Sequence, residues 1–283
     1  MSRDSVSQKN SAAPRPASTQ ESGPSGPVAL VTGASRGIGR GIATVLAGKG
    51  YDIAFSYHTS REDALELQQN IQAMGRKCVF YQAVLETSGV AEQLCASVLS
   101  DLGRIDVLVC NAGKTRYGSV LTMEEKDVDF LYGLNFRSYL MCAKYAAHSM
   151  IDRQVPGRII FISSTRGQRA YPEDLVYGSL KAGLNRAVQS LALELAEHRI
   201  TVNSIAPGAT KVRGDLSPEG LTQGFIPTLV PLGRYGSPEE VGHLAAYLAS
   251  PEAAYITGQT IYMDGGLILP GQPEQPERSK QPE

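Results

Sequence analysis

The sequence predicts an α/β protein with a doubly wound parallel sheet in a single domain. Seven short apolar runs alternate with longer amphipathic segments, and this alternation is typical of βαβ units joined by right-handed crossovers. The runs are apolar throughout, as expected for strands that helices cover on both faces. Several of the amphipathic segments end at a glycine, which is a common C-terminal signal of helices.

We expect each apolar run to be a strand, with helices in most of the segments between them. Such a sheet binds its ligand beyond the carboxyl ends of the strands. In chain order the strands are predicted in VALVTG at 28, DIAFSY at 52, CVFYQAV at 78, IDVLVCNAG at 105, GRIIFISS at 157, ITVNSIAPG at 200 and QTIYMDGG at 259. The helical segments include GRGIATVLAGKG at 39, SREDALELQQNIQAMG at 60, VAEQLCASVLSDLG at 90 and LKAGLNRAVQSLALELAEH at 180.

The two ends of the chain differ in composition from the part between them. Residues 1–27 are rich in Ser, Pro and Gln, and residues 270–283, PGQPEQPERSKQPE, have a similar composition. Because such segments cannot bury enough apolar surface to become ordered, we expect both to be disordered tails. The predicted folded unit is therefore 28–269, which the usual size of a domain permits as one domain.

Composition restricts the class of partner. The 283 residues carry a formal net charge of -1 without a long basic cluster, so nothing favours nucleic acid or an anionic membrane surface. No stretch reaches the roughly eighteen apolar residues of a membrane span, and the N-terminus lacks the apolar core of a secretory signal. We expect a cytoplasmic protein without membrane contact, whose partner is a small molecule or a protein.

The cysteines and histidines show no metal-binding pattern. The cysteines lie in apolar or helical segments without a CxxC pair, so we expect reduced thiols. The four histidines are scattered without ligand spacing, and no metal site is predicted. The cysteines are Cys78, Cys95, Cys110 and Cys142.

A glycine-rich turn follows the first predicted strand. In TGASRGIG at 32–39, the glycines Gly33, Gly37 and Gly39 fall where a tight turn into a helix brings backbone N–H groups against a pyrophosphate. A glycine cluster alone could be a flexible loop. Its place between the first strand and the first helix favours a dinucleotide-binding site.

The end of the second strand indicates which dinucleotide binds. An NAD-binding unit places an acid there to hold the adenosine ribose, and this chain has Tyr57 instead. Without a carboxylate the 2′ position can carry a phosphate, so NADP(H) is favoured over NAD(H). The phosphate donors would be Arg36, His58, Ser60 and Arg61, although these four could also be ordinary polar loop residues.

A tyrosine and a lysine stand four residues apart in YGSLK at 177–181. On a helix Tyr177 and Lys181 would share one face, within reach of the same ligand. Alone, such a pair is usually only part of a solvated face. Its meaning depends on the motifs that surround it.

The glycine turn, an asparagine, a serine, the tyrosine and the lysine follow one another in one order. Together they resemble the classical short-chain dehydrogenase/reductase family. The resemblance covers essentially residues 28–269 and implies a Rossmann fold. Its motifs are TGASRGIG at 32–39, NAG at 111–113, Asn135, Ser163 with Ser164, and Tyr177 with Lys181.

The chemistry of carbonyl reduction gives these residues roles. A nicotinamide supplies a hydride but no proton, and a tyrosine, whose ordinary pKa is about 10, can supply the proton if a cation lowers that pKa. We therefore expect Lys181 to lower the pKa of Tyr177. By resemblance, Lys181 also holds the nicotinamide ribose, Ser164 hydrogen-bonds the substrate carbonyl, and Asn135 holds a water that links Lys181 to solvent.

The resemblance thus implies two sets of site residues. The catalytic set is Asn135, Ser164, Tyr177 and Lys181. The cofactor-binding set is Gly33, Ser35, Arg36, Gly37, Ile38, Gly39, Tyr57, His58, Ser60, Arg61, Asn111, Ala112, Gly113, Tyr177, Lys181, Pro207, Gly208 and Thr210.

Four positions depart from the family pattern. They bear on the strength of cofactor binding more than on the reaction. They are Val84 where an aspartate usually contacts the adenine, Cys110 and Leu180 beside the NAG and lysine motifs, and Val212 where a threonine commonly meets the carboxamide.

Three segments are similar to the 3-oxoacyl-[acyl-carrier-protein] reductase branch of the family, and also to its bacterial glucose and other alcohol dehydrogenases: GRIIFISS at 157, ITVNSIAPG at 200 and residues 231–266. We expect NADP(H)-dependent reduction of a carbonyl, first of a small or carrier-bound 3-oxoacyl thioester in fatty acid biosynthesis, with a sugar, steroid or other secondary-alcohol dehydrogenase as the alternative. A non-catalytic dinucleotide sensor is the alternative of another class. The substrate wall at 165–176 carries Arg166, Arg169, Glu173 and Asp174, more charge than an aliphatic pocket requires unless they point to solvent.

A homotetramer is expected from the resemblance, because classical members commonly pair through the helix before the fifth strand and through the catalytic helix. The first of these, SYLMCAKYAAHSMI at 138–151, is apolar nearly all round, more than burial against one side of a sheet requires. Association would cover such residues if they were exposed on a monomer. The alternative is that they pack only against the chain's own sheet and loops.

Overall fold

The computed structural model describes residues 26–212 and 229–269. The two predicted tails lie outside the described residues except for Gly26 and Pro27. Most of the predicted substrate loop at 209–236 also lies outside them.

Seven parallel strands form one sheet in the order β3-β2-β1-β4-β5-β6-β7. The chain winds outward in one direction from β1 to β3 and in the other from β4 to β7, so the doubly wound architecture is confirmed. All seven predicted strands are present. They are β1 (Val28–Val31), β2 (Asp52–Tyr57), β3 (Cys78–Gln82), β4 (Val107–Cys110), β5 (Arg158–Ile162), β6 (Thr201–Pro207) and β7 (Thr260–Met263).

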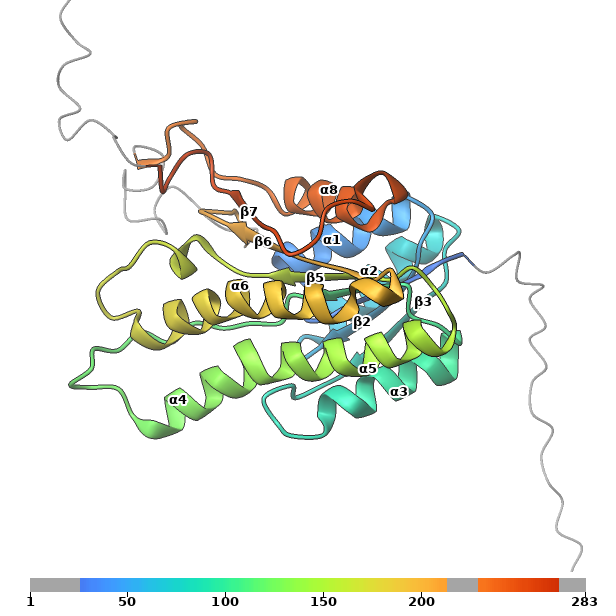
Figure 1. The fold of residues 1–283 in the computed structure, drawn as a ribbon, viewed down its shortest axis with the longest axis horizontal. Helices are drawn as coiled ribbons and strands as arrows, with labels where there is room; N and C mark the ends of the chain where they lie inside the picture. The colour runs from blue at the N-terminus through green and yellow to red at the C-terminus, as the bar shows by residue number, and fades with distance from the viewer. Residues whose placement is uncertain (1–25, 213–228, 270–283) are drawn as a thin grey trace, which may run out of the picture.

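Helices cover both faces of the sheet, with α1, α2 and α8 on one face and α3, α5 and α6 on the other (Figure 1). The helices are α1 (Gly37–Gly48), α2 (Arg61–Ala73), α3 (Val90–Leu102), α4 (Glu125–Tyr132), α5 (Ser138–Asp152), α6 (Leu175–Leu195) and α8 (Pro238–Ala249). Shorter turns are the π-helical η1 (Gly133–Arg137) and the 3-10 turns η2 (Thr165–Gly167), η3 (Ala196–His198) and η4 (Pro251–Ala253).

Neighbouring residues of one strand belong to different halves of the core. Leu30 and Leu108 pack under α3, α5 and α6, whereas Val31 and Val109 pack under α1, α2 and α8. Successive side chains of a strand point to opposite faces. Because both faces are buried, the strands read as apolar runs without alternation.

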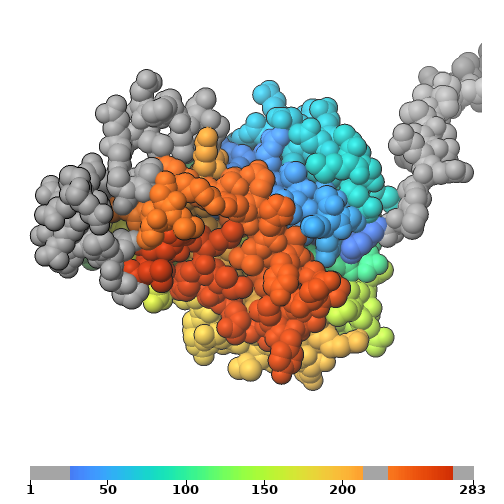
Figure 2. Space-filling view, turned by 90° about the horizontal axis from the view of Figure 1, so that it is seen from above, coloured from blue at the N-terminus to red at the C-terminus, as the bar shows by residue number. Residues whose placement is uncertain are grey.

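The helices α1 and α8 meet through backbone. A Cβ on Gly41 would lie 2.5 Å from the carbonyl carbon of Pro238, and one on Gly242 would lie 2.8 Å from the carbonyl oxygen of Gly41. Figure 2 shows α8 (orange) beside α1 (blue) on this face of the molecule. The N-terminus of α8 is closed by a capping box, in which Ser237 Oγ accepts from the Glu240 N–H (3.2 Å) and Glu240 Oε2 accepts from the Ser237 N–H (2.8 Å).

The helix α5 is buried by the chain itself. Its side chains Tyr139, Cys142 and Met150 belong to the core, and Lys144 and His148 are the exposed positions within 138–151. Of the two alternatives that the sequence left open for this helix, the structure favours packing against the chain itself, because α3 and the sheet cover most of its apolar residues.

Two further features bear on the sequence predictions. The four cysteines are free and buried, which agrees with the expected reduced thiols. Across residues 26–212 and 229–269, no helix combines the length and the apolar character needed to cross a bilayer.

Candidate active site

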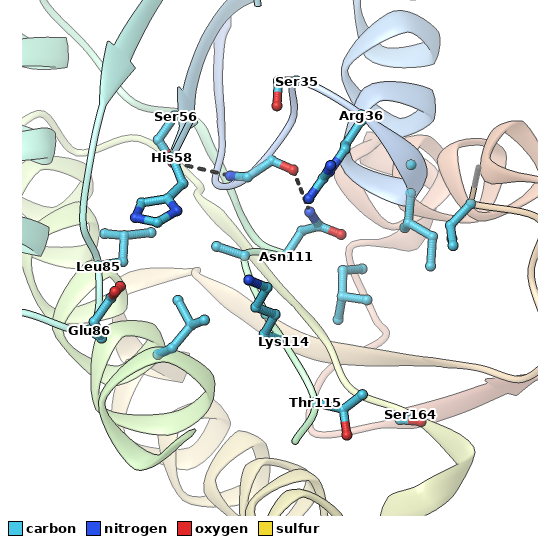
Figure 3. A pocket seen from close by; sticks show the side chains of 18 of the residues that line it. Ser35, Arg36, Ser56, His58, Leu85, Glu86, Asn111, Lys114, Thr115 and Ser164 are labelled. Carbon is cyan, nitrogen blue, oxygen red and sulfur yellow. Dashed lines mark hydrogen bonds between the residues drawn. The ribbon is translucent and has the colours of Figure 1, made fainter. Parts of the chain in front are cut away.

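A cavity of about 860 Å³ opens at the carboxyl ends of the central strands. It lies where the winding direction reverses between β1 and β4, which is the usual ligand crevice of such a sheet. The glycine turn after β1 lines one side, and Ser164, Tyr177 and Lys181 line another. Figure 3 shows this pocket from close by. The two groups of residues singled out in the sequence therefore share one cavity.

The glycine turn has the shape of an anion-binding site. Gly33 and Gly37 adopt positive φ angles of 66° and 58°, and a Cβ on Gly39 would lie 2.5 Å from both the Gly33 carbonyl oxygen and Asn111 Nδ2. The first turn of α1 contains no acidic residue, and no side chain of the described residues caps it. Its N–H groups and the positive end of the helix dipole are thus available to a phosphate.

Polar side chains hold the turn in place. Thr32 Oγ1 accepts from the N–H groups of Asn111 (2.9 Å) and Ala112 (3.0 Å), and Asn111 Nδ2 donates to the carbonyls of Thr32 and Gly33 (both 3.0 Å). Ser56 Oγ accepts from the Gly33 N–H (3.1 Å), as the dashed lines of Figure 3 show in part. Three strand ends are therefore tied together. The sequence analysis missed Thr32 and Ser56, whose signal is a hydroxyl at or near the end of each of the first two strands.

Arginine and histidine side chains lie at the predicted adenosine end of the pocket. Tyr57 is 6% exposed and packs edge-on against Phe80 with ring centroids 5.6 Å apart. Arg36 and His58 project into the pocket (Figure 3), and Ser60 lines it as well. No acid replaces Tyr57 at the end of β2, where an NAD-binding unit would use one.

The loop after β3 contributes a carboxylate that the sequence analysis missed. Glu86 and Leu85 line the pocket (Figure 3), whereas Val84 is 39% exposed and does not. The position where the family commonly has an aspartate therefore makes no side-chain contribution to the pocket here.

Asn135 supports the wall of the cavity after the NAG motif, because its side chain hydrogen-bonds to backbone groups there. Its side chain is fully buried within η1, where Nδ2 donates to the carbonyls of Lys114 (2.9 Å) and Leu131 (3.2 Å) and Oδ1 accepts from the Lys114 N–H (3.2 Å). The π-helical turn that presents it is a rare element that recurs at functional sites. Asn135 thus fixes the backbone just after the NAG motif, with Lys114 in the pocket lining.

Lys181 is buried at the base of the cavity. Its Nζ donates to the Ile162 carbonyl (2.8 Å) and to the Tyr139 hydroxyl (3.3 Å). Burial lowers the pKa of Lys181 to about 7, because the ammonium loses its water shell. This lysine therefore exchanges its proton close to neutral pH.

The pKa of Tyr177 is shifted in the opposite direction, upward. Burial raises its pKa to about 12, a hydrogen bond with Ser164 opposes the rise, and the carboxylate of Asp174 adds to it. The expectation that Lys181 lowers the pKa of Tyr177 is wrong for this arrangement. Lys181 Nζ lies 5.5 Å from the centre of the tyrosine ring and, with its own pKa lowered, is only a partial cation.

Most predicted site residues meet in this cavity. Its lining includes Gly33, Ser35, Arg36, Gly37, Ile38, Tyr57, His58, Ser60, Asn111, Ala112, Gly113, Ser164, Tyr177, Lys181, Pro207 and Gly208. Outside the lining are Gly39, Arg61, Asn135 and Thr210. The lining residues that the sequence analysis missed include Ser56, Leu85, Glu86, Lys114, Thr115 and Arg116.

Comparison with known proteins identifies the family. A family model described as enoyl-(acyl carrier protein) reductase matches residues 33–268. The chain is also 40% identical over 245 residues to a 3-oxoacyl-[acyl-carrier-protein] reductase of Synechocystis sp., across 86% of this chain and 97% of that protein. The chain belongs to the short-chain dehydrogenase/reductase family. It is therefore an oxidoreductase whose family binds a nicotinamide dinucleotide.

Solved structures of similar proteins share the fold. An acetoin dehydrogenase of Salmonella typhimurium superposes with a TM-score of 0.82 at 32% identity, across 88% of this chain and 98% of that one. A blue fluorescent protein from a metagenomic library, solved in complex with NADPH, superposes with a TM-score of 0.81 at 32% identity, across 86% and 98%. The short-chain dehydrogenase/reductase fold thus extends over nearly all of the described residues.

Proposed function

We propose that this chain is an NADP(H)-dependent reductase that converts a carbonyl to an alcohol, with a 3-oxoacyl thioester, free or carrier-bound, as substrate. The observation that carries the proposal is that Ser164, Tyr177 and Lys181 line the same cavity as the glycine turn. A dinucleotide-binding sensor would have no need of three such side chains at one wall. The similarity to 3-oxoacyl-[acyl-carrier-protein] reductases supports the substrate class.

The residues of the pocket fit a nicotinamide dinucleotide. The N-terminus of α1, which no side chain of the described residues caps, suits its diphosphate, as do Gly33 and Gly39, which leave no room for a Cβ. Arg36 and His58 would hold a 2′-phosphate, and Lys181 would donate to the nicotinamide ribose. When bound, the reduced cofactor supplies the hydride.

The chain's own residues supply the proton and hold the reacting oxygen. Ser164 donates a hydrogen bond to the substrate carbonyl and remains beside it as negative charge develops. Tyr177, with a pKa of about 12, keeps its proton at neutral pH and gives it to that oxygen as the alcohol forms. Lys181, with a pKa of about 7, can return a proton to the site near neutral pH.

The preference for NADP(H) rests on Arg36 and His58, which line the pocket, and on Tyr57, which stands at the end of β2 in place of an acid. Titrating NADPH and NADH into the protein, with the nicotinamide fluorescence as signal, should show tighter binding of NADPH. Arg36→Leu should weaken NADPH binding about tenfold while changing NADH binding little. Equal or tighter binding of NADH by the parent would overturn the preference.

The substrate class is tested by following NADPH oxidation with a 3-oxoacyl thioester and with a small diketone. The diketone represents a second candidate, a secondary-alcohol dehydrogenase, which the likeness to acetoin dehydrogenase favours. Turnover of the thioester at the higher kcat/KM supports the first candidate, and turnover of the diketone alone supports the second. Tight cofactor binding without turnover of any carbonyl would support the sensor.

The proposal includes a cytoplasmic homotetramer. Buried free thiols suit a reducing compartment. Leu193 of α6 is 82% exposed and Tyr255 is fully exposed, so apolar surface that association could cover lies there instead of on α5. Light scattering coupled to size exclusion should give about four times the chain mass of 30.3 kDa. A single-chain mass at micromolar concentration would exclude the tetramer.

A further inference from the structure

A charged pair connects the two turns that carry Ser164 and Tyr177. Arg166 Nη1 lies 3.0 Å from Asp174 Oδ2, and the Arg166 N–H donates to Ser164 Oγ (3.2 Å). Asp174 immediately precedes α6, and its carbonyl accepts from the Gly178 N–H (3.0 Å) in the turn that contains Tyr177. One ion pair therefore spans from the end of β5 to the first turn of the catalytic helix.

The surroundings hold this pair in one place. The Arg166 guanidinium lies over the rings of Tyr171 (4.6 Å) and Tyr117 (5.3 Å). A Cβ on Gly178 would lie 3.0 Å from the Arg166 carbonyl oxygen and 3.2 Å from Asp174 Oδ2, so the first turn of α6 packs directly on both partners. A side chain at Gly178 would separate them from the helix.

The Asp174 carboxylate is an unusual group to bury. Its side chain is 2% exposed, and the Arg166 guanidinium 3.0 Å away is its hydrogen-bonded counter-charge. Burying an ion pair carries a desolvation cost that the attraction between the charges seldom fully repays, and a purely structural contact at this place would be met better by apolar side chains.

We infer that Arg166 and Asp174 form a positioning pair for the proposed reaction, which holds Ser164 and Tyr177 together and sets the charge beside the Tyr177 hydroxyl. This inference rests on the proposed function of Tyr177 as general acid. Charges buried near an acid act on it strongly because little water screens them. The carboxylate opposes loss of the tyrosine proton, and the guanidinium favours it.

The other groups that face Tyr177 differ from this pair. Ser164 is a neutral hydrogen-bond partner, Tyr117 and Tyr139 are phenols, and Lys181 is half-titrated near neutral pH. Removing the Asp174 charge therefore removes a full negative charge from the surroundings of Tyr177 and leaves the remaining groups unchanged.

The experiment compares pH profiles of kcat/KM for carbonyl reduction in the parent and in Asp174→Asn, which keeps the shape of the side chain. The alkaline limb, where the tyrosine loses its proton, should move to lower pH by about one unit in Asp174→Asn. In Arg166→Lys, which keeps the charge, the limb should stay near that of the parent while kcat falls. Arg169→Gln is the matched control, because Arg169 lies over the same Tyr171 ring (5.6 Å) but donates to the Leu267 carbonyl.

The outcomes separate the inference from the proposed function. An Asp174→Asn variant that loses activity with its alkaline limb unmoved, or a limb moved equally by Arg169→Gln, overturns the positioning pair. Cofactor affinity, measured by fluorescence titration, should match the parent in Asp174→Asn and shows that the variant is folded. If Tyr177→Phe keeps the activity of the parent, the proposed function fails, whatever Asp174→Asn does.

Discussion

The two sides of the pocket differ in the groups that they present, backbone on one side and side chains on the other. The side formed by the turn after β1 is mainly backbone, with glycines in positive φ and a helix N-terminus that no side chain of the described residues caps. The side formed by the end of β5 and by α6 consists of side chains whose pKa values are strongly shifted. Backbone N–H groups bind an anion without titrating, whereas side chains can move protons. Binding and chemistry should therefore respond to different substitutions.

Tyr177→Phe is expected to have the largest effect among the substitutions that test this division between binding and chemistry. Loss of the hydroxyl removes the proposed general acid, so kcat should fall about a thousandfold. Affinity for NADPH should stay close to that of the parent, because the glycine turn is untouched. Steady-state kinetics and a fluorescence titration measure the two quantities, and near-normal turnover would show that the acid is another group.

Lys181→Met tests the side of the pocket that consists of side chains. The quantity measured is the free energy of unfolding as a function of pH. The folded chain gives up the Lys181 proton at a pKa of about 7, and the unfolded chain at about 10.5. Within that window the unfolded state binds more protons, so the stability of the parent rises with pH by about 1 kcal/mol per unit. Burial of the charged Lys181 lowers the free energy of unfolding by its full amount below the folded-state pKa. This loss disappears as the pH approaches the pKa of the unfolded chain.

In Lys181→Met this rise should be absent. Urea unfolding at several pH values across the window gives the free energy of unfolding of both proteins. The advantage of the variant should be largest at neutral pH and shrink as pH increases, while its turnover is lost. Two parallel profiles would mean that Lys181 is not desolvated in the folded protein.

Gly39→Ala tests the backbone half. The added Cβ would collide with the Gly33 carbonyl and Asn111 Nδ2, both at 2.5 Å, and the turn must open. Affinity for NADPH should fall at least about tenfold. The matched control is Gly48→Ala at the other end of α1, where no atom of the described neighbours lies within 4 Å of the added Cβ. Similar losses in both variants would indicate a general effect on the helix instead of on the turn.

Ser237→Ala gives the smallest expected effect and sharpens the contrast between two helix N-termini. In α8 the capping box satisfies the first turn internally, whereas the described residues supply no such cap to α1. Removing the Ser237 hydroxyl should lower the free energy of unfolding by about 1 kcal/mol, as measured by urea unfolding. NADPH affinity should not change. A marked loss of affinity would mean that the two termini are not independent.

The sequence predicted the elements whose signals are local. Apolar runs located all seven strands, and the motifs that contain Gly33, Tyr177 and Lys181 brought together residues that share one cavity. The strand and helix alternation predicted a ligand site beyond the carboxyl ends of the strands, and the structure places it between β1 and β4.

The missed features depend on contacts between distant segments. Thr32 and Asn111 are far apart in sequence and meet through strand ends, and the π-helical turn around Asn135 has no sequence signature. The direction of the Tyr177 pKa was mispredicted because the spacing of Tyr177 and Lys181 says nothing about how deeply the lysine is buried.

The contact between α1 and α8 has a mechanical consequence. Because Gly41 and Gly242 bring backbone against backbone, the two helices touch directly at these positions, and we expect them to move together. The N-terminus of α1 faces the pocket, so this contact links α8 to the glycine turn. A displacement of α8 would therefore also displace the glycine turn.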